Sequence, residues 1–172
     1  IERQTVEKNI FDEAIDMITK NKLDKNSGIV LYNENWHNGV IGIVASRLVS
    51  MYYKPIILLT KEQGVIRGSG RCQVGFSLYD SLCECKDYIE QFGGHELAAG
   101  LTISEEKLND FVLKFDEIVN KRTDGDTLQI IDIDMQIYRK DLNTSLLKDI
   151  YNLKPYGQSN KVPVFLYKGC CN

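Results

Sequence analysis

The amino-acid sequence predicts an α/β protein followed by a small β-rich unit. Two observations support this fold class. Segments with helical periodicity alternate with short apolar runs of strand length as far as residue 123, and strands prevail after it. Of the 172 residues, 43% are hydrophobic, which is enough for an ordinary core and too much for a disordered chain. This length corresponds to one large domain, or to one domain and part of another.

Five segments are expected to be helical: residues 1–22, 40–53, 77–82, 86–92 and 104–119. The first has apolar residues at three- and four-residue spacing with charged residues between them. Asn38 is expected to cap the second helix and Ser77 the third, because short polar side chains accept hydrogen bonds from free N–H groups. The fourth helix is expected to end at Gly93-Gly94 and the fifth to begin at Ser104.

Short apolar or alternating runs predict strands at residues 28–32, 56–60, 65–66, 98–103, 128–135 and 162–167. Residues 123–126 (Thr-Asp-Gly-Asp) are polar and turn-prone, and we place a domain boundary there. The tail beyond it also contains a predicted helix at residues 144–153. About 45 residues are few for an independent domain. We therefore expect the tail to be part of a small β-rich unit that is either cut short or packed against the first domain.

The composition restricts the possible functions. A formal net charge of −3 argues against a protein that coats nucleic acid through bulk charge, although it permits a local basic site. No apolar run approaches the ~20 residues that span a bilayer, and no signal segment or initiator Met precedes the first helix. We therefore expect no membrane contact and a chain that begins inside a longer protein. The five cysteines are odd in number and form no C-x-x-C pair, which favours reduced thiols in the cytoplasm over disulfides or zinc.

The first candidate binding segment is Gly68-Ser69-Gly70-Arg71. Glycines let the backbone approach a ligand closely, and successive exposed N–H groups make a concavity that suits an oxyanion. Ser69 adds a hydroxyl donor, and Arg71 adds a planar charged fork that matches phosphate geometry. The alternative is a tight turn that carries a surface arginine. The segment has the spacing of neither a Walker loop nor a dinucleotide fingerprint.

The second candidate is Gly93-Gly94-His95, which is followed by small residues at 98–100. Its glycines place the imidazole on a backbone that can approach a ligand, where His95 could donate to phosphate or transfer a proton. The alternative is a helix C-cap with a surface histidine. Trp36 and His37 form a third candidate at a predicted helix start, where anions are attracted. Trp36 could stack on a base or lie in the core.

The sequence contains no recognisable metal site or nucleophile. Neither His37 nor His95 has acids or cysteines at ligand spacing, no D-H-H or H-x-x-E cluster occurs, and no nucleophile elbow is present. Hydrolysis of phosphodiesters usually needs a divalent metal. We therefore expect a chain that holds a phosphorylated substrate and binds no cofactor itself.

Four sequence blocks occur in a characteristic order. They are residues 36–47 (Trp-His-Asn-Gly-Val-Ile-Gly-Ile-Val-Ala-Ser-Arg), 53–55 (Tyr-Lys-Pro), 68–71 (Gly-Ser-Gly-Arg), and 92–95 (Phe-Gly-Gly-His) with 98–100 (Ala-Ala-Gly). Together they resemble the DHHA1 domain of the RecJ family of bacterial single-strand-specific DNA exonucleases. Residues 153–160 (Leu-Lys-Pro-Tyr-Gly-Gln-Ser-Asn), with Pro163 and Phe165, are similar to the start of that family's OB-type domain. The resemblance covers nearly the whole chain, and the order of the blocks makes it specific.

The resemblance implies a DHHA1-type domain with a mixed central sheet flanked by helices, followed by a partial β-rich OB-like unit. Residues 1–22 would be a connecting helix, 23–122 the DHHA1 substrate-binding domain and 126–172 part of the OB-type domain. An upstream DHH domain, absent from this chain, would bind Mn²⁺ or Mg²⁺. In the family the G-S-x-R arginine and the G-G-H segment contact substrate phosphates, so these roles pass to Arg71 and residues 93–95. Cys72 stands where serine is usual, and no binding role is expected for it.

The implied function is the substrate-binding portion of a 5′→3′ single-stranded-DNA exonuclease, inactive alone, that acts in DNA repair and recombination. Single-stranded DNA is the implied substrate, and single-strand-binding protein and a helicase are implied partners. Tyr138, Tyr151 and Tyr156 are candidates for base stacking in the tail. Three alternatives stay open: a DHH-DHHA1 phosphoesterase acting on oligoribonucleotides or dinucleotides, a non-catalytic nucleic-acid-binding module, and a structural domain without a ligand.

Overall fold

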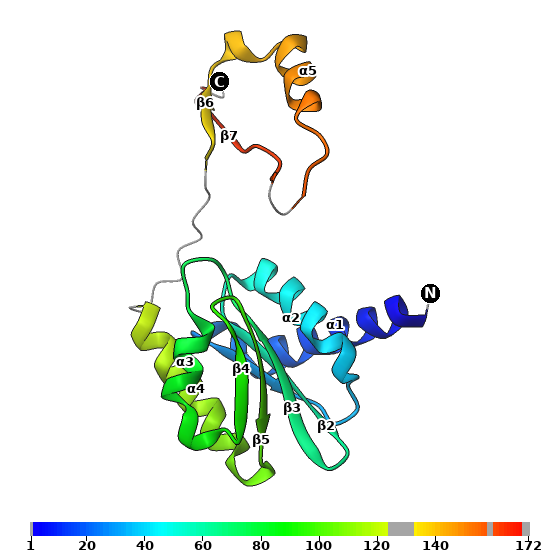
Figure 1. Ribbon diagram of the computed structural model, residues 1–172, viewed down its shortest axis with the longest axis vertical. Helices are drawn as coiled ribbons and strands as arrows, with labels where there is room; N and C mark the ends of the chain where they lie inside the picture. Colours follow the sequence, from blue (N-terminus) through cyan, green and yellow to red (C-terminus); the bar gives the residue numbers. More distant parts are fainter. Residues whose placement is uncertain (1, 124–132, 158–159, 170–172) are drawn as a thin grey trace. The chain divides into compact units, whose positions relative to one another are not determined.

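The computed structural model describes residues 2–123, 133–157 and 160–169 (Figure 1). The chain divides into two compact units, Ile1–Leu128 and Gln129–Asn172. The expected boundary at residues 123–126 lies mostly outside the described residues and stays a prediction. The same holds for most of the predicted strand at residues 128–135.

A five-stranded sheet runs through the first unit in the order β1-β2-β3-β5-β4. Its strands are β1 (Ile29–Tyr32), β2 (Ile56–Glu62), β3 (Val65–Arg71), β4 (Gln91–His95) and β5 (Ala98–Ile103). β1 and β2 are parallel, whereas all other neighbours are antiparallel. The sheet is therefore mixed, as predicted, and β3 lies at its centre.

Helices cover both faces of this sheet: α1 (Glu2–Asn21), α2 (Asn38–Tyr52), α3 (Leu78–Glu84) and α4 (Leu108–Thr123), with 3₁₀ turns at Leu23–Lys25, Lys86–Tyr88 and Glu105–Lys107. Figure 1 shows α1 and α2 on one side of the sheet and α3 and α4 on the other. Ile56 and Leu58 of β2 pack in the core under α1 and α2, and Ile57 and Leu59 pack under α3 and α4. Burial on both faces explains the uninterrupted apolar run in β2. The predicted α/β fold class is confirmed.

Two local predictions are wrong. His37, rather than Asn38, caps α2, because its Nδ1 accepts the Gly39 N–H at 3.1 Å. The helix predicted at residues 86–92 is a single 3₁₀ turn followed by β4. Gly93-Gly94 does not end a helix but lies inside β4, whose pairing with β5 outweighs the low strand propensity of glycine.

The second unit contains strands β6 (Met135–Ile137) and β7 (Phe165–Tyr167), which are parallel. A 3₁₀ turn (Arg139–Asp141) and helix α5 (Thr144–Asn152) connect them. The helix predicted at residues 144–153 is confirmed, and the strand predicted at residues 162–167 is shorter than expected. Among the described residues of this unit, Ile137 is the one buried hydrophobic side chain.

The three tyrosines that are candidates for base stacking differ in exposure. Tyr138 and Tyr151 are 49% and 66% exposed. The hydroxyl of Tyr156 instead donates to the carbonyl of Ile150, and its ring is half-buried. Base stacking in this unit stays a prediction, for which Tyr138 and Tyr151 have the more accessible rings.

Candidate nucleic-acid interface

Strand β3 places the two glycines of the first candidate segment against the core. A Cβ added to Gly68 would lie 2.4 Å from Leu59 Cδ2, and one added to Gly70 would lie 2.9 Å from Leu78 Cδ2. β3 pairs with β2 on one side and with β5 on the other, so the backbone of both glycines is committed to the sheet. The expected oxyanion concavity is therefore not formed by Gly68 and Gly70. They serve close packing under buried leucines.

Ser69 and Arg71 point to the opposite face, because successive side chains of a strand alternate. Arg71 Nη1 donates to Ser69 Oγ at 3.0 Å and to Gly70 O at 2.7 Å. Its Nη2 lies over Gly42 of α2, only 2.8 Å from where a Cβ would be. Arg71 forms no salt bridge with any residue that the structure describes. A guanidinium held in place without a carboxylate partner is suited to an external anion.

Pairing with β5 and β4 brings the second candidate segment onto the same face. Two rows of directly opposed residues cross the three strands: Arg71–Ala98–His95 and Ser69–Gly100–Gly93. Directly opposed residues share a face of the sheet. Arg71 and His95, which are distant in sequence, therefore lie on either side of a strip of small residues.

Gly93 and Gly100 form a glycine floor within this strip. Both are exposed. A Cβ added to Gly93 would meet nothing within 4 Å, and one added to Gly100 would meet only Gly68 O at 3.8 Å. α2 packs on β2 and β3, and a depression of about 230 Å³ opens over β4 and β5. A phosphodiester can approach such a backbone closely because no side chains intervene.

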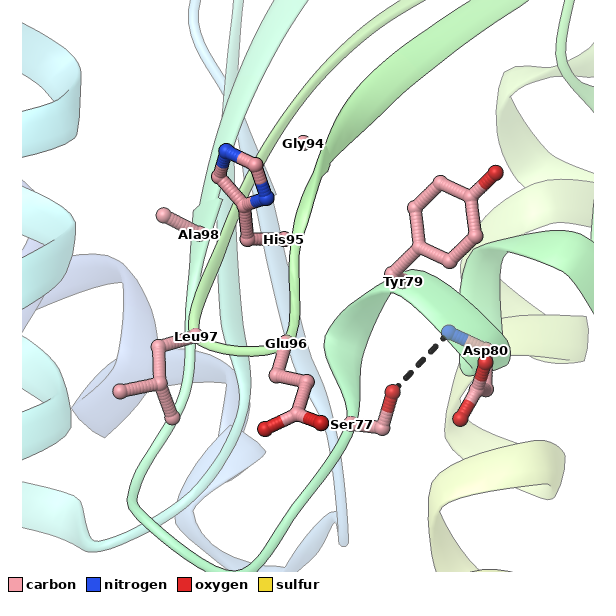
Figure 2. Close-up of a pocket in the computed structure, with 8 residues that line it drawn as sticks. All are labelled: Ser77, Tyr79, Asp80, Gly94, His95, Glu96, Leu97 and Ala98. Atoms are coloured by element: carbon pink, nitrogen blue, oxygen red, sulfur yellow. Dashed lines mark hydrogen bonds between the residues drawn. The ribbon is translucent and has the colours of Figure 1, made fainter.

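His95 lies at the end of β4, next to the tight turn into β5. The preceding Gly94 has a φ of +153°, and a Cβ there would lie 2.3 Å from Ala98 O, so this position requires glycine. His95 is exposed and, like Tyr79, is one of the residues around a pocket of about 750 Å³. In Figure 2 the His95 ring lies on the opposite side of the strand from Tyr79. His95 is thus accessible from the side that carries Arg71.

The turn between β4 and β5 is anchored to β3 and α3. Glu96 O accepts the Leu78 N–H at 2.8 Å. The same oxygen lies 3.1 Å from Cys72 Sγ, and the Cys72 N–H donates to Leu97 O at 3.2 Å. These contacts hold the turn against the end of β3, and so they fix the position of His95.

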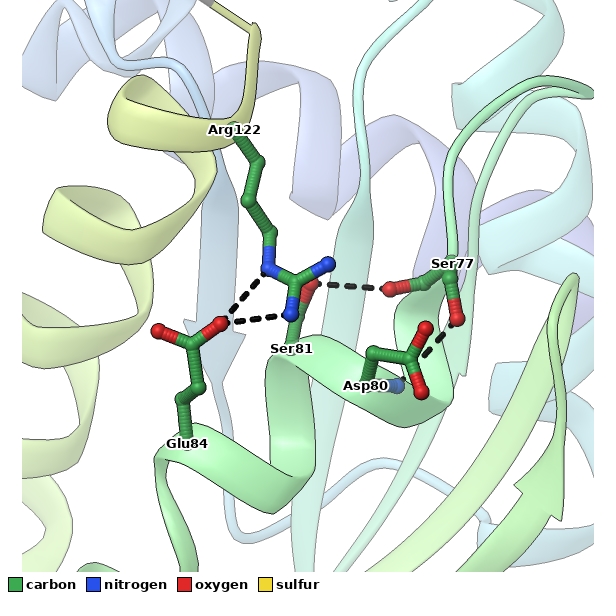
Figure 3. A network of polar contacts seen from close by, with 5 residues as sticks. All are labelled: Ser77, Asp80, Ser81, Glu84 and Arg122. Carbon is green, nitrogen blue, oxygen red and sulfur yellow. Dashed lines mark hydrogen bonds and ion pairs between the residues drawn. The ribbon is translucent and has the colours of Figure 1, made fainter.

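Helix α3 is in turn fixed by a polar network (Figure 3). Ser77 caps it, as predicted, by accepting the Asp80 N–H at 3.2 Å, and Ser81 Oγ donates to Ser77 O at 2.8 Å. Arg122 of α4 donates through Nε to Glu84 Oε1 at 2.9 Å. Because α3 begins where the turn is anchored, this network supports the second candidate segment from the far side of the sheet.

Cys72 has a structural position. It is 8% exposed, packs in the core under α3 and α4, and its Sγ lies 3.3 Å from Phe76 O. Burial raises the pKa of the Cys72 thiol to about 11, and burial likewise raises the pKa of Cys85 to about 12. Both thiols are therefore protonated at neutral pH. Cys72 faces away from Ser69 and Arg71, so the missing serine hydroxyl leaves their surface unchanged.

The third candidate does not join the other two. Trp36 is 4% exposed, and its Nε1 donates to Glu13 Oε2 at 2.8 Å. Trp36 is thus the core residue of the two alternatives and has no free face for a base. His37 is exposed and caps α2, and it lines a different pocket, with Arg3 among its neighbours, from those that contain Arg71 or His95.

The roles of Gly42 and Gly100 are not among the roles expected from the sequence. A glycine inside a helix costs roughly 0.5–1 kcal/mol relative to alanine, and this cost is the signal that marks Gly42. No comparable signal marks Gly100, because its exposure depends on which part of the sheet α2 leaves uncovered.

Residues 2–123, 133–157 and 160–169 contain no candidate metal site. No three His, Cys, Asp or Glu side chains there are grouped as a metal site would require. The Mn²⁺ or Mg²⁺ that the resemblance implies for an upstream DHH domain stays a prediction. In the same part of the chain, no helix is both long enough and apolar enough to cross a membrane.

The mixed sheet and its glycine-containing face define a class of domain. Residues 25–121, more than half of the chain, match the family model of the DHHA1 domain. The chain belongs to the DHHA1 domain family.

Within this family the chain is similar to RecJ proteins. It is 37% identical over 165 residues to the single-stranded-DNA-specific exonuclease RecJ of Bacillus subtilis, covering 94% of this chain and 21% of the relative. It is 35% identical over 144 residues to RecJ of Haemophilus influenzae, covering 80% and 25%. The crystal structure of RecJ from Thermus thermophilus in complex with Mn²⁺ matches with a TM-score of 0.79 at 26% identity, over 96% of this chain and 24% of that chain. The chain thus spans a quarter or less of the length of these three relatives.

Proposed function

We propose that this chain is the substrate-binding portion of a 5′→3′ single-stranded-DNA exonuclease. The observation that carries the proposal is Arg71, held without a carboxylate partner among the described residues, in one row with Ala98 and His95 beside the glycine floor. A planar charged fork, a histidine donor and a floor without side chains suit the phosphates of a nucleic-acid strand. This arrangement is local, so it is compatible with a net charge of −3. The RecJ names of the relatives support single-stranded DNA as the substrate class.

We place the chemistry outside this chain. A DHH domain that binds Mn²⁺ or Mg²⁺ would cut the strand, and this chain alone would bind without cutting. Residues 1–22 would be the connecting helix, 23–122 the DHHA1 domain and 126–172 part of an OB-type domain. The parent enzyme would act in cytoplasmic DNA repair and recombination beside single-strand-binding protein and a helicase. The small share of the relatives' length that this chain spans supports this division.

The test is fluorescence anisotropy of a 5′-phosphorylated single-stranded oligonucleotide titrated with this chain at low and moderate salt. Binding should be selective against duplex, and the logarithm of the affinity should fall with the logarithm of salt at a slope of about −0.7 per phosphate contact. Arg71→Ala should weaken binding roughly tenfold to hundredfold, because a hydrogen bond to a charged group contributes about 1.5–3 kcal/mol.

Lys20→Ala is the matched control, since it also removes one positive charge. Lys20 lies on α1 with 75% of its side chain exposed and pairs with Asp16. Equal losses of affinity in the two variants would mean that Arg71 acts only through net charge, and the proposed site would be wrong. Competition by a phosphorylated dinucleotide as strong as that by the oligonucleotide would favour a phosphoesterase for short substrates instead.

A further inference from the structure

A third row of directly opposed residues crosses the sheet beyond the glycine floor. Thr102 of β5 pairs with Arg67 of β3 on one side and with Gln91 of β4 on the other. Side chains two residues apart on a strand point to the same face of the sheet. Arg67, Thr102 and Gln91 therefore share the face that carries Arg71 and His95, and this face continues past the glycine floor.

The pattern of burial shows that all three rows are open to solvent. On β3 and β5, buried residues alternate with residues that are exposed or half-buried, and the residues of the three rows fall at the open positions. The residues that β4 contributes to the rows are exposed as well. The depression of about 230 Å³ is lined by Gln91 and Thr102 as well as by Gly93 and Gly100. It therefore joins the glycine floor to the third row.

The three rows form a track whose long axis follows β5, the strand between β3 and β4 (Figure 1). Arg71 and Arg67 lie on the β3 side of the track, and four residues of strand correspond to about 14 Å between them. This length matches about four nucleotides at the 3.4 Å rise of one strand of B-DNA, and fewer when the strand is extended. One strand can therefore place different phosphates on the two arginines.

The third row has hydrogen-bond donors that the fold leaves available. Arg67 contacts the Glu62 carboxylate through Nε at 3.4 Å, and about half of each side chain is exposed. An exposed ion pair of this kind is weak, so a phosphate can displace Glu62. Among the described residues, the side chains of Thr102 and Gln91 have no hydrogen-bond partner. Guanidinium, hydroxyl and amide groups are the side-chain donors that contact phosphates in complexes with nucleic acid.

We propose that the single strand runs lengthwise along β5, with one phosphate at Arg71 and another phosphate of the same strand at the row of Arg67, Thr102 and Gln91. This inference rests on the proposed function, because it takes its first phosphate position from Arg71. The length of the track sets the substrate class. Strands of about four nucleotides or more contact both ends of the track, whereas the adjacent phosphates of a dinucleotide stay at one end. The third row thus favours oligonucleotides over dinucleotides.

The test is isothermal titration calorimetry of the full chain with a 5′-phosphorylated thymidine dinucleotide and with the corresponding hexanucleotide. Arg67→Ala should lower the affinity for the hexanucleotide several-fold and reduce its salt slope by about 0.7, the value of one phosphate contact. Gln91→Glu, which keeps the shape of the side chain and adds a negative charge, should also weaken the hexanucleotide. Neither variant should change the affinity for the dinucleotide. Lys20→Ala and Gln4→Glu make the same changes of charge at exposed positions of α1 and are the matched controls.

Arg71→Ala in the same titrations separates the two proposals. If it weakens both oligonucleotides while Arg67→Ala and Gln91→Glu behave like their controls, the path along β5 is overturned and the phosphate site at Arg71 stands. Equal losses for dinucleotide and hexanucleotide in Arg67→Ala would also overturn the path. If Arg71→Ala loses no more affinity than Lys20→Ala, the proposed function fails and the path fails with it. Arg67 and Gln91 lie on different strands, so misfolding of one variant leaves the other as a test.

Discussion

At the scale of single residues, the position of the Arg71 guanidinium depends on an absent side chain. Gly42 lies inside α2, where alanine would be more favourable by roughly 0.5–1 kcal/mol. An added Cβ would lie 2.8 Å from both Arg71 Nη2 and Ser69 Oγ. Both atoms belong to movable side chains, so the fold can accommodate the methyl group, but the guanidinium must leave its place.

Gly42→Ala is therefore expected to separate stability from binding. Thermal unfolding should shift to an equal or higher temperature, because helix propensity improves. Affinity for a 5′-phosphorylated single strand should fall about tenfold, which corresponds to about 1.4 kcal/mol. Met51→Ala, at a 59% exposed position of the same helix, should leave affinity unchanged. Retained affinity in Gly42→Ala would show that Arg71 needs no fixed position.

The buried thiol of Cys72 predicts a loss of stability at high pH. Its pKa is about 11 in the folded chain against an ordinary value of 9.0. The contribution is fully present below pH 9 and is lost as the pH rises toward 11, because the unfolded chain releases its proton first. Denaturant unfolding of the wild type and Cys72→Ser should show the wild type losing up to about 1.4 kcal/mol per pH unit relative to the variant. A constant difference from pH 7 to pH 11 would contradict burial of the thiol.

At the scale of the element, β4 contains two adjacent glycines that differ in whether a Cβ could be accommodated. A Cβ at Gly94 would lie 2.3 Å from Ala98 O at a φ of +153°, so Gly94→Ala should destabilise the unit strongly. A Cβ at Gly93 would meet nothing within 4 Å, so Gly93→Ala should keep the melting temperature. Gly93→Ala should nevertheless weaken strand binding several-fold, because its methyl group projects from the glycine floor. Melting curves and anisotropy on both variants check this pairing.

The difference between Gly93→Ala and Gly94→Ala serves as the control for this prediction. If both variants lose stability equally, the exposed position of Gly93 is wrong. If Gly93→Ala binds DNA as the wild type does, the floor does not touch the strand. A loss of stability in Gly94→Ala alone could not follow from a general weakness of β4, since the two substitutions add the same group one residue apart.

These elements also show which parts of the molecule the sequence could predict. Apolar periodicity is local information, so α1, α2 and the buried strands β1 and β2 are predicted close to their observed limits. β4 is not, because its glycines have low strand propensity and only pairing with β5 makes them a strand. The same pairing sets Arg71 beside His95, and the alternation of β3 turns Gly68 and Gly70 into packing residues. The sequence thus shows which chemical types of residue the site contains. It does not show on which face of the sheet each of them lies.

At the scale of the whole molecule, the two units differ in how much apolar surface they bury. The first unit has two cores, one on each face of its sheet. In the second, Ile137 is the one buried hydrophobic residue among those described, while Leu147, Tyr151 and Val162 are each more than half exposed. Burial of apolar surface is the main favourable contribution to folding, at roughly 25 cal/mol per Å². The second unit therefore has little buried apolar surface of its own to stabilise it against local opening.

Hydrogen exchange followed by mass spectrometry should reveal this difference in the intact chain. Amides of β2 should exchange only through global unfolding, because this strand contributes buried residues to both cores. Amides of β6, α5 and β7 should exchange orders of magnitude faster, through local opening that leaves the sheet of the first unit intact. Single-stranded DNA should slow exchange at β4 and β5, where the glycine floor is exposed. Equal protection of both units would mean that the second unit gains its stability from contacts beyond its own few buried side chains, and a chain ending at residue 128 would then melt at a lower temperature than the full one.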